Sequence, residues 1–370
     1  MAFVQRIDQV LPVLAGRDAI GQHTLGLREV IRAMGLQSDI YYADASPDVL
    51  RQGIPVERIG DRESAGRLLI YQLSIGSRVG DVFAHRPEAK LVDYHNITPA
   101  DLIDMWEPAI AAELRWGREQ MRAMASDCLY ALADSAFNAA ELSADGYSRS
   151  AVAPLLIDFD ALGTQPDPRT RGRLQKLAKK GGADWLFVGK VAPHKAQHDL
   201  VKAFVVYRAA YDPKARLHVV GGSISESYTH AVQTLVRDFD VEGAVEFTGS
   251  VTRNELAAYY SCADVFVCLS DHEGFCVPLV EAMAQQVPVV AYGAAAVPDT
   301  VGEAAVLLPS KDPALVATAV HRVLSDEMLR RSLAEASDRR VEQLALPAAR
   351  SVVTELMTDI VNLVESGVGA

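Results

Sequence analysis

Short apolar runs rich in β-branched residues recur along the chain, and longer stretches with helical spacing separate them. This alternation is typical of parallel sheets covered by helices, because each crossover between parallel strands needs a long connection. We therefore predict an α/β protein. The expected strands of the first half are 9–14, 67–73, 90–95, 128–134 and 151–157, and those of the second half are 184–189, 216–222, 245–249, 264–270, 288–293 and 304–309.

The strand series divides into two units. A chain of 370 residues is long for one core, since domains usually hold ~100–200 residues. The Pro-, Gly- and charge-rich stretch 161–183 reads as a linker that leads into a basic helix. We place the first unit at 1–165 and the second at 166–346. The apolar stripe within 347–370 predicts a last helix that packs on its own unit or returns to the first.

Composition and charge narrow the function classes. The chain has 49% hydrophobic and 23% charged residues, so a disordered main state is excluded. A net charge of -12 argues against binding nucleic acid through its phosphates. The four cysteines form no CxxC pair, which favours reduced thiols and a cytoplasmic location. The N-terminal stretch lacks signal-peptide features, and no apolar run approaches the ~20 residues of a membrane span.

One stretch could still touch a membrane surface. Residues 112–125 carry Arg115, Arg118 and Arg122 near Trp116 on a predicted helix. A peripheral contact at the inner membrane face is one interpretation. A solvated surface helix is the other, since Glu113 and Glu119 dilute the charge. The oligomeric state is left open.

The stretch 270–284, SDHEGFCVPLVEAMA, carries the most informative chemistry. Pro278 predicts a helix start, because proline suits the first turn. The backbone N–H groups of Gly274, Phe275, Cys276 and Val277 then face outward with a partial positive charge and can receive a phosphate. Glu273 and Glu281 would flank that position and accept hydroxyl groups of a sugar. The same residues also suit an ordinary loop and helix start.

Further candidates follow the ends of other predicted strands, where open α/β sheets bind ligands. In the second half these are the cations Lys190 and Lys195, together with Gly222, Ser250 and Val251 in later loops. In the first half His95 and Asn96 follow a strand, while Gly21 and His23 belong to a loop and helix start. Scattered surface lysines, helix caps and structural histidines are the alternative interpretations.

Two Asp-Phe-Asp triplets, 158–160 and 238–240, are candidate metal ligands. Neither has a second acidic cluster placed beside it. We therefore predict no metal site.

Taken together, these segments resemble the retaining glycosyltransferases of family GT4, which have the GT-B fold of two facing Rossmann-like domains. The segment that carries most weight is the E-x7-E element from Glu273 to Glu281. It is supported, in family order across 184–310, by FVGK, VVGG, FTGSVTRNELAAYYSCADVFVCLS and VPDTVGEAAVLLP. DAIGQHTLGLREVIRAMG, DYHNITP and DSAFNAAEL extend a looser resemblance over the first half.

The resemblance implies a retaining transfer of a sugar from a nucleotide-diphosphate donor to a hydroxyl acceptor in glycoconjugate synthesis. It assigns the donor diphosphate to Lys190, Lys195 and the amides of 275–277, donor-sugar hydroxyls to Glu273 and the ribose to Glu281. The base would lie at the Ser250 loop, and His95 at the reacting sugar. The first domain would bind the acceptor. It implies no cofactor and no metal, only the donor as cosubstrate, and it favours a C-terminal helix that crosses back to the first domain.

Three positions depart from the family pattern: Lys190 replaces an arginine, and Cys276 and Gln286 replace glycines. A thiol at a helix N-terminus favours thiolate, so we expect oxidation or alkylation of Cys276 to affect donor binding. Two other functions stay open. One is another GT-B enzyme, an epimerase or a phosphorylase, and the other is a non-catalytic nucleotide- or sugar-binding subunit. The sequence does not distinguish UDP from GDP donors or name the sugar and acceptor.

Overall fold

The computed structural model describes residues 3–60, 66–159 and 165–367. The predicted linker therefore lies partly outside the described residues, as does Asp160. The chain forms two units. Unit 1 holds residues 1–100, 109–157 and 344–370, and unit 2 holds residues 101–108 and 158–343. The sequence did not predict that 101–108 belong with the second unit.

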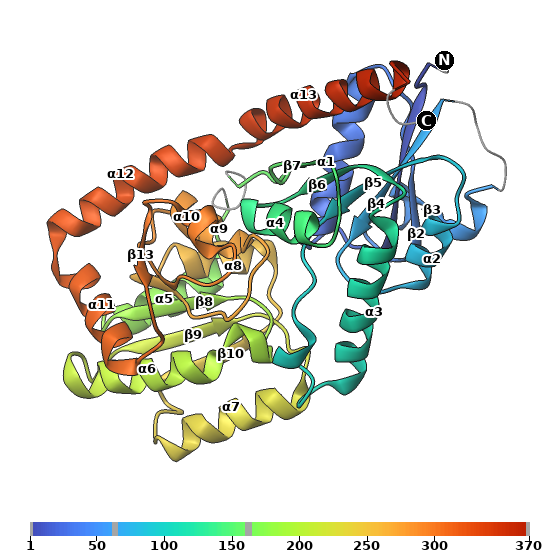
Figure 1. Cartoon of the computed structure of the whole chain (residues 1–370). Coiled ribbons are helices and arrows are strands. Elements are labelled where there is room, and N and C mark those ends of the chain that lie inside the picture. The colour runs from blue at the N-terminus through green and yellow to red at the C-terminus, as the bar shows by residue number, and fades with distance from the viewer. Residues whose placement is uncertain (1–2, 61–65, 160–164, 368–370) are drawn as a thin grey trace. The chain divides into compact units, whose positions relative to one another are not determined.

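Unit 1 is built on a seven-stranded parallel sheet with the order β3-β2-β1-β4-β5-β6-β7 (Figure 1). Its strands are β1 Arg6–Leu14, β2 Ile40–Ala45, β3 Ile54–Pro55, β4 Arg67–Leu73, β5 Ala89–Tyr94, β6 Cys128–Ala133 and β7 Ser150–Val152. Its helices are α1 Ala19–Ala33, α2 Arg78–Ala84, α3 Pro108–Met124, α4 Ala136–Ala144 and α13 Leu346–Glu365.

The last helix, α13, completes the core of unit 1. Its buried residues Ala349, Val353, Met357 and Ile360 join a cluster that includes residues of β1, β4 and α1. Helices α1 and α13 lie side by side (Figure 1). The expected return of the C-terminal helix to the first unit is thus confirmed, and the apolar stripe is buried where helical spacing places it.

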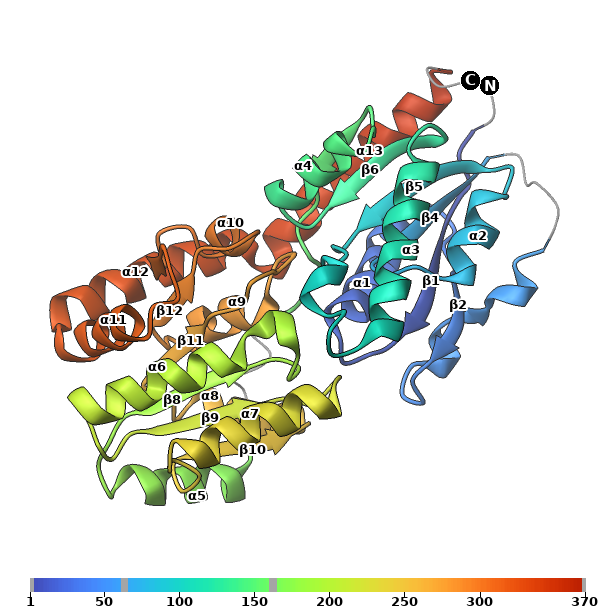
Figure 2. The same ribbon diagram turned by 60° about the horizontal axis from the view of Figure 1, so that its bottom comes forward.

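Unit 2 is built on a six-stranded parallel sheet with the order β10-β9-β8-β11-β12-β13 (Figure 2). Its strands are β8 Asp184–Val188, β9 Arg216–Val220, β10 Val245–Gly249, β11 Val265–Cys268, β12 Val289–Tyr292 and β13 Ala305–Leu308. Its helices are α5 Pro168–Ala178, α6 Gln197–Ala210, α7 Glu226–Asp238, α8 Arg253–Tyr260, α9 Val277–Ala284, α10 Val297–Val301, α11 Pro313–Ser325 and α12 Glu327–Leu344. The predicted α/β class with two Rossmann-like units is confirmed.

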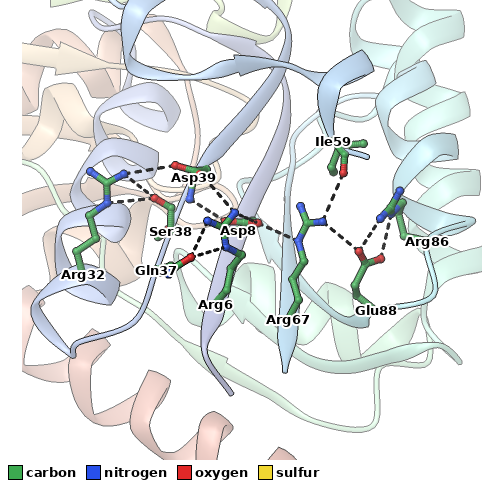
Figure 3. A network of polar contacts seen from close by, with 10 residues as sticks. All are labelled: Arg6, Asp8, Arg32, Gln37, Ser38, Asp39, Ile59, Arg67, Arg86 and Glu88. Carbon is green, nitrogen blue, oxygen red and sulfur yellow. Dashed lines mark hydrogen bonds and ion pairs between the residues drawn. The ribbon is translucent and has the colours of Figure 1, made fainter. Parts of the chain in front are cut away.

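A buried ionic network ties the amino ends of β1, β4 and β5 together (Figure 3). Arg67 Nε donates to Asp8 Oδ2 at 2.9 Å, and Arg67 Nη1 lies 3.3 Å from Glu88 Oε1. Arg86 Nη2 holds the same Glu88 oxygen at 2.6 Å. Ligands of parallel sheets bind at the opposite, carboxyl edge, so we assign this network to the fold of unit 1.

Individual residues explain two element boundaries. Thr252 caps α8 and forms a capping box with Glu255. The strand expected at 151–157 ends at Val152 instead. Pro154 has no N–H group to donate to a sheet, which explains why the ladder stops beside it.

No helix of the described residues is both long enough and apolar enough to cross a membrane. On α3, Arg118 Nη2 lies 2.8 Å from Glu141 Oε1, and Arg122 Nε lies 3.1 Å from Asp145 Oδ1. Arg118 and Arg122, which the sequence suggested for a membrane surface, therefore form intramolecular ion pairs.

Candidate functional site

The predicted residues of unit 2 gather where the strand order reverses. The chain leaves β8 toward β9 on one side and later returns to β11 on the other, so β8 and β11 are neighbours with connections that diverge. Such a switch point leaves a crevice at the carboxyl edge of a parallel sheet. Lys195 follows β8, and the loop from Glu273 to Val277 follows β11. The topology therefore brings these two segments together.

Lys195 and Glu273 form a close ion pair at this edge. Lys195 Nζ lies 2.6 Å from Glu273 Oε2, with side-chain exposures of 20% and 7%. Burial acts to lower the pKa of Lys195, but the Glu273 carboxylate outweighs it and the pKa is raised. Lys195 is thus a cation held at the switch point. A polyanionic ligand could replace Glu273 as the ion-pair partner of Lys195.

The loop before α9 contains a residue in the left-handed region of backbone conformation. Cys276 is the N-cap of α9 with a left-handed φ of 71°, a conformation that glycine adopts without strain. Gln286 just beyond the helix has φ 57°. The two positions where the family resemblance expects glycine are thus two positive-φ positions. Thr300 Oγ1 on α10 donates to the carbonyl of Phe275, which ties the loop to that helix.

Cys276 also contacts a second thiol. Its hydrogen bond to Cys268 lowers the pKa of Cys268 and raises the pKa of Cys276 well above its ordinary value. The expectation that Cys276 itself favours thiolate is therefore wrong. The hydrogen bond with the partner thiol at the end of β11 is the largest cause of this shift, and burial adds to it.

Glu281 is fixed by a tyrosine that the sequence did not single out. Tyr260 Oη at the end of α8 donates to Glu281 Oε2 at 2.8 Å. Partial burial raises the pKa of Glu281 despite this hydrogen bond. One carboxylate oxygen is thus anchored. No pattern marks Tyr260 in the sequence, because the contact joins two helices.

The loops after β9 and β10 place Gly222 beside Ser250. A Cβ atom at Gly222 would lie 2.7 Å from Ser250 Oγ, so the glycine permits this close approach. Val251 is half-buried, and Ser250 and Lys190 are exposed. Lys190 thus belongs to the same sheet edge, while the Lys195 pair stands deeper in it.

Sequence reasoning also missed a third cation at this edge, Lys311. Lys311 Nζ lies 2.6 Å from Asp271 Oδ1 and 2.8 Å from Asp199 Oδ2. Lys311 follows β13 and Asp271 follows β11. The two carboxylates neutralise this lysine and connect the start of α6 to the loop that carries Glu273. A strand-end position, the signal used for Lys190, could have found it.

In unit 1, His95 belongs to a chain of hydrogen bonds that crosses four strands. Gln9 Nε2 on β1 donates to the carbonyl of Thr24 at 2.9 Å. Gln72 Nε2 on β4 donates to Gln9 Oε1 at 2.9 Å, which turns Gln72 Oε1 toward His95 Nε2. On the other side, His95 Nδ1 lies 3.0 Å from both carboxylate oxygens of Asp134, after β6.

This chain determines the protonation of His95. The carbonyl of Thr24 can only accept, so each amide orientation follows from it, and Gln72 offers His95 an acceptor. Asp134 offers an acceptor as well, and both ring nitrogens must donate. Burial lowers the pKa of His95, but the charges of Asp134 and Asp93 raise it to about 9. His95 is therefore a buried imidazolium.

His23 lies beside His95, and both of its ring nitrogens have partners. Its Nε2 lies 2.9 Å from Asp93 Oδ2, and its Nδ1 accepts from the backbone N–H of Leu156 at 3.1 Å. These hydrogen bonds connect α1 to β5 and to the segment that contains Leu156. They support the structural interpretation of this histidine.

Asn96 and Gly21 also have structural partners. Asn96 takes a left-handed φ of 77° and donates from Nδ2 to Asn138 Oδ1 at 2.8 Å. A Cβ at Gly21 would lie 1.7 Å from the carbonyl oxygen of Ala15, so only glycine allows α1 to start there. The structure thus gathers His95, His23 and Asn96 near the ends of β1 and β5, and Gly21 shapes the turn.

Comparison with known proteins follows the division into units. Residues 169–340 match the sequence family described as glycosyl transferases group 1. A GDP-mannose-dependent alpha-(1-6)-phosphatidylinositol monomannoside mannosyltransferase of Mycobacterium tuberculosis is 32% identical over 172 residues, 44% of this chain and 44% of that protein. A D-inositol 3-phosphate glycosyltransferase of Geodermatophilus obscurus is 31% identical over 232 residues, 60% of this chain and 50% of that protein. These matches span about half the length of the curated relatives.

Solved structures match over nearly the whole chain. Sucrose-phosphate synthase from Thermosynechococcus elongatus has a TM-score of 0.74 at 20% identity, covering 96% of this chain and 99% of that one. Anabaena HepE, solved in complex with UDP and glucose, has a TM-score of 0.75 at 15% identity, covering 96% and 100%. At these identities the likeness concerns the fold, which is of the GT-B type. The second unit, over residues 169–340, is therefore similar to the glycosyl transferases group 1 family.

Proposed function

We propose that the chain is a glycosyltransferase that moves a sugar from a nucleotide-diphosphate donor to a hydroxyl acceptor with retention of configuration. The observation that carries this proposal is the Lys195–Glu273 pair, 2.6 Å apart, beside the N-terminus of α9 at the switch point of unit 2. A cation, a carboxylate and outward backbone N–H groups are the three groups that a sugar diphosphate requires.

Lys195 and Glu273 have different partners in the absence and in the presence of the donor. Without donor, Lys195 and Glu273 neutralise each other. With donor, the diphosphate takes the lysine together with Lys190 and the amides of 274–277, and Glu273 turns its oxygens to the sugar hydroxyls. The leaving diphosphate gains negative charge as the glycosidic bond breaks. A fixed cation and fixed amides stabilise that charge more in the transition state than in the ground state.

Glu281 is assigned to the ribose. Tyr260 occupies one of its oxygens at 2.8 Å and leaves the carboxylate oriented as an acceptor for vicinal hydroxyls. Gly222, Ser250 and Val251 are assigned to the base. Acceptor binding is assigned to unit 1, where the imidazolium of His95 supplies a positive charge. Since both of its nitrogens already donate, His95 does not act as a general base in this proposal.

Relatives suggest which donors to test first. GDP-mannose comes first, because the mycobacterial relative is named as dependent on it. UDP-glucose comes second, because HepE was solved with it. For acceptors, phosphatidylinositol mannosides and inositol 3-phosphate are the first candidates, following the printed names of the relatives.

Binding of GDP and UDP by calorimetry tests the proposal, with urea unfolding beside it. A nucleotide at ~100 times its Kd should raise the free energy of unfolding by about 2.7 kcal/mol. Lys195→Met should lose the effect, since it removes the cation, whereas Lys202→Met on α6 should keep it. Glu281→Gln should weaken binding of the nucleotide and of a deoxyribose analogue by different factors.

Three results would count against the proposal. If neither nucleotide binds, unit 2 is not a donor site of this kind. If Lys195→Met binds as the native chain does, the diphosphate lies elsewhere. Turnover of a nucleotide sugar with no acceptor would instead indicate an epimerase.

A further inference from the structure

Two thiols and a carboxylate meet at the turn between β11 and α9. Cys268 is the last residue of β11, Glu273 lies in the loop, and Cys276 is the N-cap of α9. Their Sγ and carboxylate oxygen atoms all lie within 4.8 Å of one another. Cys268 and Glu273 are buried and Cys276 is half-buried. The positive φ of Cys276 turns its side chain back toward the strand end that the loop has just left.

This donor set matches the zinc group of cations. Two sulfurs and one carboxylate oxygen are ligands that Zn²⁺ and the softer Cd²⁺ prefer over Mg²⁺ or Ca²⁺. In a tetrahedral site with Zn–S near 2.3 Å, two sulfurs lie about 3.8 Å apart. The three ligand atoms all lie within 4.8 Å of one another, a limit that includes this spacing. Three protein ligands leave a fourth position for water or another ligand.

The charges balance around such an ion. A divalent cation with two thiolates and the Glu273 carboxylate carries one negative charge, and the ammonium of Lys195 lies 2.6 Å from Glu273 Oε2. The whole group is then neutral, which lowers the cost of placing an ion in a buried site. Binding releases one proton from each thiol to solvent, and no atom is oxidised or reduced.

We propose that Cys268, Cys276 and Glu273 form a binding site for one soft divalent cation of the zinc group. The site goes beyond the proposed transfer reaction, and binding of the ion does not require that function. An ion there uses the Glu273 carboxylate that the proposed donor site assigns to the sugar hydroxyls, and it occupies space in front of the α9 amides. It therefore excludes a diphosphate from this edge of unit 2, so that metal and nucleotide compete.

Titration of the reduced full-length chain with Cd²⁺ tests the proposal. Cadmium bound to thiolates gives an ultraviolet charge-transfer band, and equilibrium dialysis counts the bound ions. We expect one ion per chain at this site. Cys268→Ser and Cys276→Ser should each weaken binding at least about 100-fold, since even changes outside the ligand set cost 10–100-fold. The matched controls are Cys128→Ser and Cys262→Ser, which keep the band.

Cys276→Gly provides a second variant that should fold, because glycine suits the φ of 71° at this position. It should also lose the band. The proposal is overturned if Cys276→Gly binds Cd²⁺ as tightly as the native chain, or if the band disappears in Cys128→Ser or Cys262→Ser. Competition by GDP or UDP is measured separately. Failure of a nucleotide to bind at all affects the transferase proposal and leaves the metal measurement valid.

Discussion

At the scale of single residues, hydrogen-bond donors and acceptors decide the chemistry of His95. The carbonyl of Thr24 fixes the orientation of Gln9 and then of Gln72, and Asp134 closes the chain on the other side. A histidine in this position cannot exchange a proton without breaking a chain that reaches from α1 to β6. Its contribution is therefore a fixed positive charge.

The pKa of His95 has a consequence for stability. It is raised from an ordinary value near 6.5 to about 9. The imidazolium therefore stabilises the fold fully below the unfolded pKa, and this stabilisation is lost as the pH rises through about 9. Asp134→Asn removes the largest favourable charge. We expect the variant to be less stable than the native chain at pH 6 and the difference to shrink above pH 9.

Urea unfolding at several pH values measures this difference, and the ring resonances of His95 in an NMR titration give its pKa directly. A His95 that titrates at or below pH 6.5 would contradict the assignment.

The sequence indicated candidate residues but not their hydrogen-bond partners. Strand-end position led to His95 and Lys195, and the predicted helix start at Pro278 led to Glu273. Neither signal led to Gln72 or Tyr260, because their contacts depend on which strands and helices become neighbours. The left-handed φ of Cys276 was likewise hidden, since a cysteine does not indicate such a conformation as a glycine does.

At the scale of elements, continuous apolar runs predicted the central strands well. These strands are buried on both faces, so their sequences are apolar throughout. The short edge strand β3 was missed, because two residues give no pattern, and β2 was missed because its second half is polar and exposed. The predicted strand does not continue over 153–157, although these residues are apolar. Pro154 and the position of β7 at the edge of the sheet explain why it ends early.

Helix α13 offers a test at this scale. Met357 is fully buried in the core of unit 1, whereas Val352 on the same helix is 41% exposed. Truncating a buried methionine to alanine costs about 2–5 kcal/mol. We expect Met357→Ala to lower the free energy of urea unfolding by that amount and Val352→Ala to change it by no more than ~0.5 kcal/mol. Equal effects would mean that α13 is not docked as described.

At the scale of the whole molecule, the two units have separate cores. Trp185 and Phe204 belong to the core of unit 2, and Leu27 and Met357 belong to that of unit 1. A ligand that binds only unit 2 should suppress local opening there and leave unit 1 unchanged. The predicted donor site thus has a signature that is independent of catalysis.

Hydrogen exchange followed by mass spectrometry measures how far a bound nucleotide suppresses local opening in each unit. With GDP or UDP bound, we expect peptides from β8, β11 and α9 to gain protection, and peptides from β1, β4 and α13 to keep theirs. Equal gains in both sets would show that the units open as one cooperative body. Gains confined to unit 1 would place the nucleotide outside the predicted site.

The return of α13 also concerns the order in which the chain is made. Protein domains usually fold in sequence as they leave the ribosome. Here all of unit 2 has been synthesised once residue 343 emerges, while unit 1 still lacks residues 344–370. The face that Ala349, Val353, Met357 and Ile360 will cover stays open until α13 has been synthesised. The part of the chain made first is therefore completed last, and its uncovered apolar face is where a chaperone would be needed.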